Sequence, residues 1–397
     1  MAPLSALDEA SPVPVVGMMG AGQLARMSHQ AAISLGIPLR ILAADATDSA
    51  ALVSPTIDIG DPGSAADLRR FATGCEIVTF DHELVDLDAL AELEHAGTVI
   101  ARPSAAALAF ATDKAHQRTR FAHRGLPLPR HRIVADAATA LAAAEELGWP
   151  AVVKTARGGY DGRGVWIVAD ADAAQAVLTT LTDADGVLPT VIVEEAVRIE
   201  RELAVVVVRG AQGTTVSYPV TETVQVDGIC RETITPARVS PEVAAEATRI
   251  AEAAAEVAGA VGLIAVELFY DGTDITINEV ATRPHNSAHW SIEGAVTSQF
   301  ENHLRAVADL PLGDTATRAP VVVSANILGH ADGRDPADHL GAALAVRGAA
   351  VHLYGKGPRP GRKLGHVTVL ADTIDDARSR ARSAVARLGD PVPEVSQ

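Results

Sequence analysis

Short apolar runs alternate with helical patterns over the first hundred residues. Runs at 14–19 and 39–44 flank a segment, 24–33, whose apolar positions recur at helical spacing and which ends at Gly36. Later apolar positions at Ile57, 75–80 and 99–101 alternate with helical segments at 68–73 and 87–95. Such alternation is typical of a doubly wound α/β domain, a parallel sheet with helices on both faces.

The pattern becomes mixed after the break Arg102-Pro103-Ser104. Helices are expected at 105–110, 113–123, 137–147, 171–181, 241–261, 336–344 and 373–388. Strands are expected at 132–134, 151–154, 165–168, 190–194, 202–209, 214–219, 265–270, 274–280, 321–328, 350–353 and 366–370. The sequence therefore predicts three folded regions, 13–103, 104–312 and 313–397, preceded by a disordered tail at 1–12.

Composition and charge narrow the possible functions. The 397 residues carry 33 Lys+Arg against 50 Asp+Glu, a formal net charge of −17, and 48% are apolar. An acidic chain is a poor partner for nucleic acid, and the sequence holds no apolar run long enough to span a bilayer. Its two cysteines are too few for a disulfide framework, and the first fourteen residues do not resemble a secretory signal. We therefore expect a cytoplasmic protein.

Two glycine motifs are candidate phosphate sites. The first, Gly17-x-x-Gly20-x-Gly22, follows an apolar run and precedes a helix, with Asp45 further on. It is compatible with a dinucleotide site and equally with the tight turn of any doubly wound fold. The second, residues 154–164, combines four glycines with Lys154 and two arginines. Backbone N–H groups in such a loop can surround an anion, and a flexible hairpin tip is the alternative.

Acidic side chains form a second group of candidates. If 265–270 and 274–280 form a hairpin, Glu267 lies opposite Glu279 among apolar neighbours, where like charges destabilise a sheet unless a cation is bound. Mg²⁺ typically takes one or two carboxylates and completes its shell with phosphate oxygens and water, and Asn278 could assist. The alternative is a surface hairpin with solvated glutamates. Glu194 and Glu195, at another strand end, are candidates for adenine or ribose contacts, or simply exposed acids.

Two polar loops point to anionic substrates. The loop at 283–290 contains Arg283, His285, Asn286 and Ser287, a set suited to binding a small oxyanion. The loop at 356–363 carries four cations without an acid, which favours a phosphate-bearing substrate, although a solvated surface loop has the same composition.

Together these motifs resemble the N5-carboxyaminoimidazole ribonucleotide synthetase family of purine biosynthesis, whose members are ATP-grasp enzymes. The resemblance covers the chain from about Val13 to Leu388. It is carried by Gly-Gly-Tyr-Asp-Gly-Arg-Gly at 158–164, Arg-Pro-His-Asn-Ser-x-His-Trp at 283–290, and the run 298–306. It implies a doubly wound N-terminal domain, a central ATP-grasp domain with a lid at about 150–198, and a small C-terminal domain.

The resemblance also implies a set of site residues. Glu267 and Glu279 would bind the metal, and Asp161, Arg283, His285 and Asn286 would be catalytic, with Asp161 orienting the amine or handling its proton. ATP would contact Lys114, Lys154, Gly159, Tyr160, Asp161, Gly162, Arg163, Gly164, Glu194, Glu195, Ala196, Val197, Glu202, Gln225, Asn278 and Glu279. The ribonucleotide would contact Gly22, Gln23, Glu83, Tyr160, Arg163, Ser287, Lys356, Arg362 and Lys363. Lys114 stands where the family often has arginine, and Gln225 where some members have histidine.

The implied activity is ATP-dependent carboxylation of the exocyclic amine of 5-aminoimidazole ribonucleotide by bicarbonate, through carboxyphosphate. The implied cofactors are ATP and Mg²⁺, or Mn²⁺, and the implied assembly is a homodimer without nucleic-acid or membrane partners. One alternative is an ATP-grasp ligase that uses formate and glycinamide ribonucleotide. A dinucleotide-binding oxidoreductase built on the first glycine motif and a catalytically silent binding protein are the others.

Overall fold

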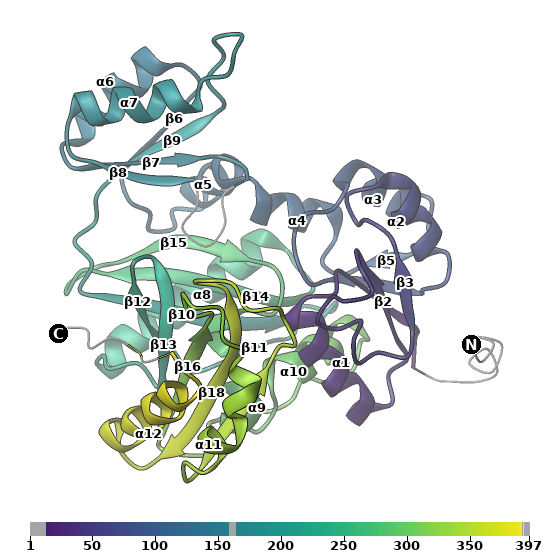
Figure 1. Ribbon diagram of the computed structural model, residues 1–397. Coiled ribbons are helices and arrows are strands. Elements are labelled where there is room, and N and C mark those ends of the chain that lie inside the picture. The colour runs from purple at the N-terminus through teal and green to yellow at the C-terminus, as the bar shows by residue number, and fades with distance from the viewer. Residues whose placement is uncertain (1–12, 159–163, 391, 393–397) are drawn as a thin grey trace.

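The computed structural model describes residues 13–158, 164–390 and 392 (Figure 1). The N-terminal region contains one sheet in the order β3-β2-β1-β4-β5, and every strand pairs in parallel with its neighbours. Its strands are β1 (Val16–Met19), β2 (Leu39–Ala43), β3 (Ile57–Ile59), β4 (Ile77–Phe80) and β5 (Ile100–Ala101). The predicted parallel sheet is therefore confirmed.

Helices cover both faces of this sheet, because its strands are apolar on both sides. One face packs against α1 (Gln23–Leu35) and the C-terminal end of α10 (Gln299–Val307). The other packs against α2 (Ala65–Ala72), α3 (Leu87–His95) and α4 (Ala105–Thr112). Gly36 ends α1 in the left-handed conformation, as its position after the last helical residue predicts.

A small antiparallel sheet in the order β6-β9-β7-β8 forms a separate body at the top of Figure 1. Its strands are β6 (His131–Val134), β7 (Ala151–Thr155), β8 (Val165–Val168) and β9 (Val191–Glu195). Two helices, α6 (Ala137–Leu147) and α7 (Ala171–Leu181), cover its outer face. This lid sheet, as we call it, includes β6 and α6, so it begins earlier in the chain than the predicted lid at 150–198.

The largest sheet, called the core sheet below, runs β15-β14-β10-β12-β13-β16-β18-β17, with β11 paired to β10. Its strands are β10 (Arg201–Arg209), β11 (Thr215–Ser217), β12 (Thr221–Val226), β13 (Ile229–Thr235), β14 (Gly262–Tyr270), β15 (Ile275–Ala281), β16 (Val321–Leu328), β17 (Ala349–Leu353) and β18 (Lys363–Ala371). The predicted hairpin between β10 and β11 is confirmed. The sheet continues past the predicted boundary at 312/313, and the sequence pattern did not reveal β12 and β13.

Helices also cover the core sheet. The longest is α8 (Pro241–Ala258), which packs on β10 and β14 and has Ser240 as its N-cap. Further helices on this sheet are α9 (Ser291–Gly294), α11 (Leu340–Leu344), α12 (Ile374–Arg387) and α10, which also packs on β10 and β14. Short 3₁₀ turns lie at Asn286–Ala288 and Pro336–His339. Helix α5 (Lys114–His123) lies between the lid and core sheets in Figure 1.

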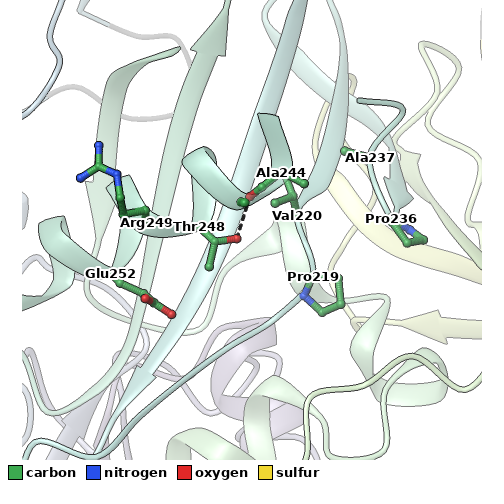
Figure 2. A pocket seen from close by; sticks show the side chains of 9 residues that line it. Pro219, Val220, Pro236, Ala237, Ala244, Thr248, Arg249 and Glu252 are labelled. Atoms are coloured by element: carbon green, nitrogen blue, oxygen red, sulfur yellow. Dashed lines mark hydrogen bonds between the residues drawn. The ribbon is translucent and has the colours of Figure 1, made fainter. Parts of the chain in front are cut away.

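A pocket with a volume of about 460 Å³ lies between α8 and the segments that precede β12 and follow β13. Figure 2 shows side chains that line it. Its lining includes Pro219, Pro236, Thr248 and Arg249, none of which belongs to the predicted site. Within the described part of the chain, no helix combines the length and apolarity needed to cross a bilayer.

Candidate active site

The two glutamates predicted to share a metal lie opposite each other on neighbouring strands of the core sheet. Glu267 of β14 pairs in register with Glu279 of β15, and the register shifts immediately afterwards, so that Leu268 pairs with Ile277. Asn278 is therefore the extra residue of a β-bulge, a feature that redirects a side chain locally. Strict strand alternation predicts that Asn278 points away from the pair, but its Oδ1 lies 3.2 Å from the Nζ of Lys154.

Two lysines bring positive charge to the same place. Lys114 is the first residue of α5, and its Nζ lies 3.2 Å from Glu279 Oε2. Lys154, near the end of β7, is buried, and its Nζ lies 2.7 Å from Glu194 Oε2. The lid sheet and α5 thus direct two ammonium groups toward the edge of the core sheet that bears the carboxylates.

Glu194 is buried and its carboxylate is occupied by two cations. Its Oε1 accepts a 2.7 Å hydrogen bond from Arg118 Nε, while Oε2 faces Lys154. Burial alone would raise the pKa of Glu194, but the two cations outweigh it and lower the pKa to about 2. Both oxygens of this carboxylate already have a cationic partner, Arg118 or Lys154, and its predicted contact with adenine or ribose stays a prediction.

The remaining residues predicted to contact adenine and ribose gather where β9 leads into β10. Glu195 pairs with Arg130 at 2.6 Å, and Ala196 and Val197 are half-buried in the connection that follows. Glu202, on β10, is partly buried and is hydrogen-bonded by the side chain of Gln225 on β12. Burial raises the pKa of Glu202 to about 7, and the Gln225 hydrogen bond opposes this rise.

The second glycine loop connects β7 to β8. Lys154 pairs with Val165 across this hairpin, and Gly158 and Gly164 both have positive φ angles, which glycine adopts without strain. The loop therefore leaves and re-enters the lid sheet next to Lys154. Predicted residues Gly159, Tyr160, Asp161, Gly162 and Arg163 lie outside the described residues.

The polar loop after β15 lies beside the carboxylate pair. His285 Nε2 is 3.4 Å from Glu267 Oε1, and Arg283 Nε donates a 2.8 Å hydrogen bond to Glu83 Oε2 on the N-terminal domain. Burial, with Arg283 and Lys363 nearby, lowers the pKa of His285 to about 4. His285 is therefore neutral near pH 7. Its Nδ1 lies 2.9 Å from Ser287 Oγ and 3.4 Å from the Ser287 backbone nitrogen, and its Nε2 faces Glu267.

Gln299 is hydrogen-bonded to the backbone of His285, although it was not predicted as a site residue. Its Oε1 accepts from the His285 backbone N–H at 2.9 Å, and its Nε2 donates to the His285 carbonyl at 2.8 Å. Gln299 is fully buried as the first residue of α10. Its only signal was its place in the run 298–306, which formed part of the family resemblance.

The predicted ribonucleotide residues come from both ends of the chain. Lys356 Nζ donates to Gln23 Oε1 on α1, and Arg362 Nη1 donates to the Gly357 carbonyl at 3.0 Å. Ser287 is buried in the 3₁₀ turn that also contains Asn286, and Lys363 begins β18. The basic loop thus lies against the N-terminal glycine turn.

That glycine turn already holds an anion from the protein itself. The Asp81 carboxylate accepts from the backbone N–H of Gly22 at 2.5 Å and of Ala25 at 3.0 Å, so it caps the N-terminus of α1. A dinucleotide pyrophosphate would require those same N–H groups. Asp45 is exposed and accepts hydrogen bonds from Thr47. The arrangement therefore disfavours the oxidoreductase alternative.

Three family models match successive parts of the chain. The ribonucleotide synthetase pre-ATP-grasp domain matches residues 13–112, and the ATP-grasp domain matches 119–300. The phosphoribosylaminoimidazole carboxylase C-terminal domain matches 322–380. The expected fold class, a mixed α/β ATP-grasp protein with a parallel N-terminal sheet, is confirmed by these matches and by the structure.

Named relatives match nearly the whole chain. The N5-carboxyaminoimidazole ribonucleotide synthase of Mycobacterium bovis is 47% identical over 382 residues, covering 94% of this chain and 87% of the relative. That of Corynebacterium ammoniagenes is 41% identical, covering 94% and 91%.

Solved structures with similar folds carry the same family name. The Aspergillus clavatus N5-carboxyaminoimidazole synthase in complex with ADP and 5-aminoimidazole ribonucleotide is 33% identical, with a TM-score of 0.86, and the match covers 95% of this chain and 99% of that one. The Thermus thermophilus N5-carboxyaminoimidazole ribonucleotide synthetase is 35% identical, with a TM-score of 0.84, and the match covers 96% of this chain and 100% of that one.

Proposed function

This chain belongs to the N5-carboxyaminoimidazole ribonucleotide synthase family of ATP-grasp ligases, and we propose that it catalyses that family's step of purine biosynthesis. The reaction carboxylates the exocyclic amine of 5-aminoimidazole ribonucleotide with bicarbonate and converts ATP to ADP and phosphate. The observation that carries the proposal is the in-register pair Glu267 and Glu279, with His285 3.4 Å from Glu267. It supports a nucleotide-phosphate centre next to a pocket for a small oxyanion.

Glu267, Glu279 and Asn278 are the residues we propose for Mg²⁺, with Mn²⁺ as an alternative. Among the described residues, no group of three or more His, Cys, Asp or Glu side chains is arranged to hold a metal. A pair of carboxylates still fits Mg²⁺, because this ion usually keeps several waters and takes further oxygens from substrate phosphates. When bound, the ion would neutralise charge that develops on the transferring phosphoryl group. Lys114 now neutralises Glu279 and would be released toward phosphate oxygens.

The positive residues near this pair are proposed to position ATP. Lys114 and Lys154 would bind phosphate oxygens, and the loop at 159–164 would cover them. Glu195, Ala196, Val197, Glu202 and Gln225 would bind adenine and ribose. Phosphoryl transfer depends mainly on positioning and charge stabilisation, and the two lysine ammonium groups could supply both.

Arg283, His285 and Asn286 are proposed to hold bicarbonate while one of its oxygens attacks the γ-phosphate. A P–O bond then forms to bicarbonate as the bond to ADP breaks, giving carboxyphosphate. Because His285 is neutral near pH 7, we expect it to contribute a hydrogen bond rather than a full charge. Glu83 fixes Arg283 from the N-terminal domain. The buried amide of Gln299 keeps His285 in place.

The ribonucleotide is proposed to lie between the oxyanion loop and the basic loop. Its phosphate would pair with Lys356, Arg362 and Lys363, and its amine would face Asp161, which takes or orients the proton as the carboxyl group is transferred. The remaining contacts would come from Gly22, Gln23, Glu83, Tyr160, Arg163 and Ser287. Closure of the lid sheet over carboxyphosphate would exclude water, which hydrolyses it.

Product analysis tests the proposal. The purified chain is incubated with ATP, Mg²⁺, ¹³C-bicarbonate and 5-aminoimidazole ribonucleotide, and the products are followed by ¹³C NMR alongside ADP release. We expect a new carbamate carbon, with ADP released in equal amount and only when the ribonucleotide is present. ADP release that requires glycinamide ribonucleotide and formate, with none from 5-aminoimidazole ribonucleotide, would replace the proposal with the formate-dependent ligase. Glu279→Gln is the matched inactive control.

We also propose that the protein is a cytoplasmic homodimer. Cys75 is a buried free thiol, as a reducing compartment favours. Light scattering coupled to gel filtration measures the mass directly, and a single 41.1 kDa species would contradict the dimer.

A further inference from the structure

A buried arginine that no site prediction contains joins the two sheets on either side of the nucleotide site. Arg118 lies one helical turn after Lys114 on α5, and its side chain is 1% exposed. Its Nε donates at 2.7 Å to Glu194 Oε1 on β9 of the lid sheet. Its Nη2 donates at 2.7 Å to the Asn278 carbonyl on β15 of the core sheet. One guanidinium thus bonds to both sheets at once.

Lys154 makes a parallel connection from the lid sheet. Its ammonium contacts Glu194 Oε2 at 2.7 Å and Asn278 Oδ1 at 3.2 Å. Glu194 and Asn278 are therefore each held by both cations, Glu194 through its two carboxylate oxygens and Asn278 through its backbone and side-chain oxygens. The four residues form a closed ring of hydrogen bonds, which leaves little freedom in the position of the lysine ammonium.

The charges in this ring explain why the Glu194 carboxylate has two cationic partners. A carboxylate buried as deeply as Glu194 with one lysine would form a neutral pair and hold the ammonium to itself. Arg118 takes one of its oxygens, so the ring keeps a net charge of +1. That remaining charge lies beside the carboxylate pair, where the resemblance and the proposed function place the phosphates of ATP.

We propose that Arg118 is a positioning residue for the nucleotide site: it holds Glu194 and the bulged strand β15 so that the Lys154 ammonium is set in place for the phosphates. The proposal rests on the proposed function for the identity of the nucleotide. It assigns Arg118 no contact with substrate. Glu194 accordingly acts on Lys154 rather than on adenine or ribose.

Binding of MgADP to the full chain tests this without requiring turnover. Calorimetry is performed on wild type, Arg118→Met, Arg118→Lys and Arg132→Met. Arg132 is the matched control, since it also forms an arginine–glutamate pair on the lid sheet, with Glu146, but there both side chains are exposed. We expect Arg118→Met to weaken MgADP binding by about tenfold or more, the size typical of losing a supporting hydrogen-bond partner. Arg132→Met should change it by less than about twofold.

The conservative variant guards against a folding defect. Arg118→Lys keeps the charge but has one ammonium for acceptors on two different sheets, so its MgADP affinity should lie between wild type and Arg118→Met. In steady-state assays the KM for ATP should rise in Arg118→Met, while the KM for 5-aminoimidazole ribonucleotide stays within about twofold. A general loss of structure would raise both.

A double-mutant cycle tests whether Arg118 acts through Glu194. In a Glu194→Gln background, Arg118→Met should cost clearly less MgADP affinity than in wild type, because the partner it orients has lost its charge. Unchanged MgADP affinity in Arg118→Lys, or full additivity in the cycle, overturns the proposal. If the chain binds MgADP and Arg118→Met weakens it, but 5-aminoimidazole ribonucleotide is not carboxylated, the proposed function fails and the positioning role stands.

Discussion

The protein's own contribution to the pH dependence of nucleotide affinity should come from one carboxyl group, Glu202. Its carboxyl is partly buried on β10, and burial raises its pKa to about 7 despite the hydrogen bond from Gln225. We propose that this carboxylate accepts hydrogen bonds from the ribose hydroxyls of ATP. Only its ionised form has full acceptor capacity, so ATP binding should favour loss of the proton.

The size of the effect follows from the raised pKa. With a pKa of about 7, Glu202 in the free protein is ionised in about a tenth of molecules at pH 6 and about nine tenths at pH 8. If only the ionised form binds ribose, affinity should rise about tenfold between these two values. The sign is fixed by the direction of the shift: a carboxyl with an ordinary pKa would be ionised throughout this range and would give a flat profile.

Calorimetric titration of MgADP at pH 6, 7 and 8, in buffers of different ionisation enthalpy, measures both the affinity and the protons released. Nucleotide phosphates also titrate near this range, so the informative quantity is the difference between wild type and Glu202→Gln. Glu202→Gln has no ionisable group at this position, so its binding of MgADP should lack the protons that Glu202 releases in the wild type. Gln225→Ala removes the hydrogen bond that lowers the pKa, and should therefore move the midpoint to higher pH.

Two results would refute this reasoning. One is an identical pH profile for wild type and Glu202→Gln, which would mean that the carboxyl does not change its protonation on binding. The other is a midpoint that moves to lower pH in Gln225→Ala, which would contradict the direction of the hydrogen bond's effect.

Three further perturbations give clear expectations. Glu279→Gln removes half of the carboxylate pair, so kcat should fall by about 10²–10³ while circular dichroism is unchanged; near-normal turnover would exclude the pair from the chemistry. Burial lowers the pKa of His303 to about 4. The stability that its neutral form gives to the fold is therefore complete above about pH 6.5 and is lost as the pH falls toward 4. Wild type should therefore lose about 2 kcal/mol more unfolding free energy than His303→Gln between pH 7 and 5 in urea titrations, and equal losses would contradict this. A Cβ on Gly22 would lie 2.4 Å from Asp81 Oδ2, so Gly22→Ala should cost about 1–3 kcal/mol in the same assay, and an unchanged midpoint would show that the cap adjusts freely.

Local patterns predicted much of this molecule. Apolar runs of strand length between helical segments predicted the parallel N-terminal sheet, and helix α3 has the predicted bounds. The pairing of Glu267 with Glu279 was also predictable, because a short hairpin fixes which residues face each other once its turn is recognised. The strands β12 and β13 were missed, since threonine, glutamate and other polar residues interrupt their valines or isoleucines and leave no strong apolar signal.

What the sequence by itself determined was the presence of an ATP-grasp ligase and the residue types of its site, because short motifs encode the turns, carboxylates and cations of one local segment. The tertiary structure alone decided how these segments meet. Arg118 bonds to Glu194 and Asn278, which are 76 and 160 residues away, and Asn278 reaches Lys154 only because a bulge shifts the register. Such partners come from separate sheets. Packing of the whole chain brings them together, and no local spacing records which buried charge will compensate another.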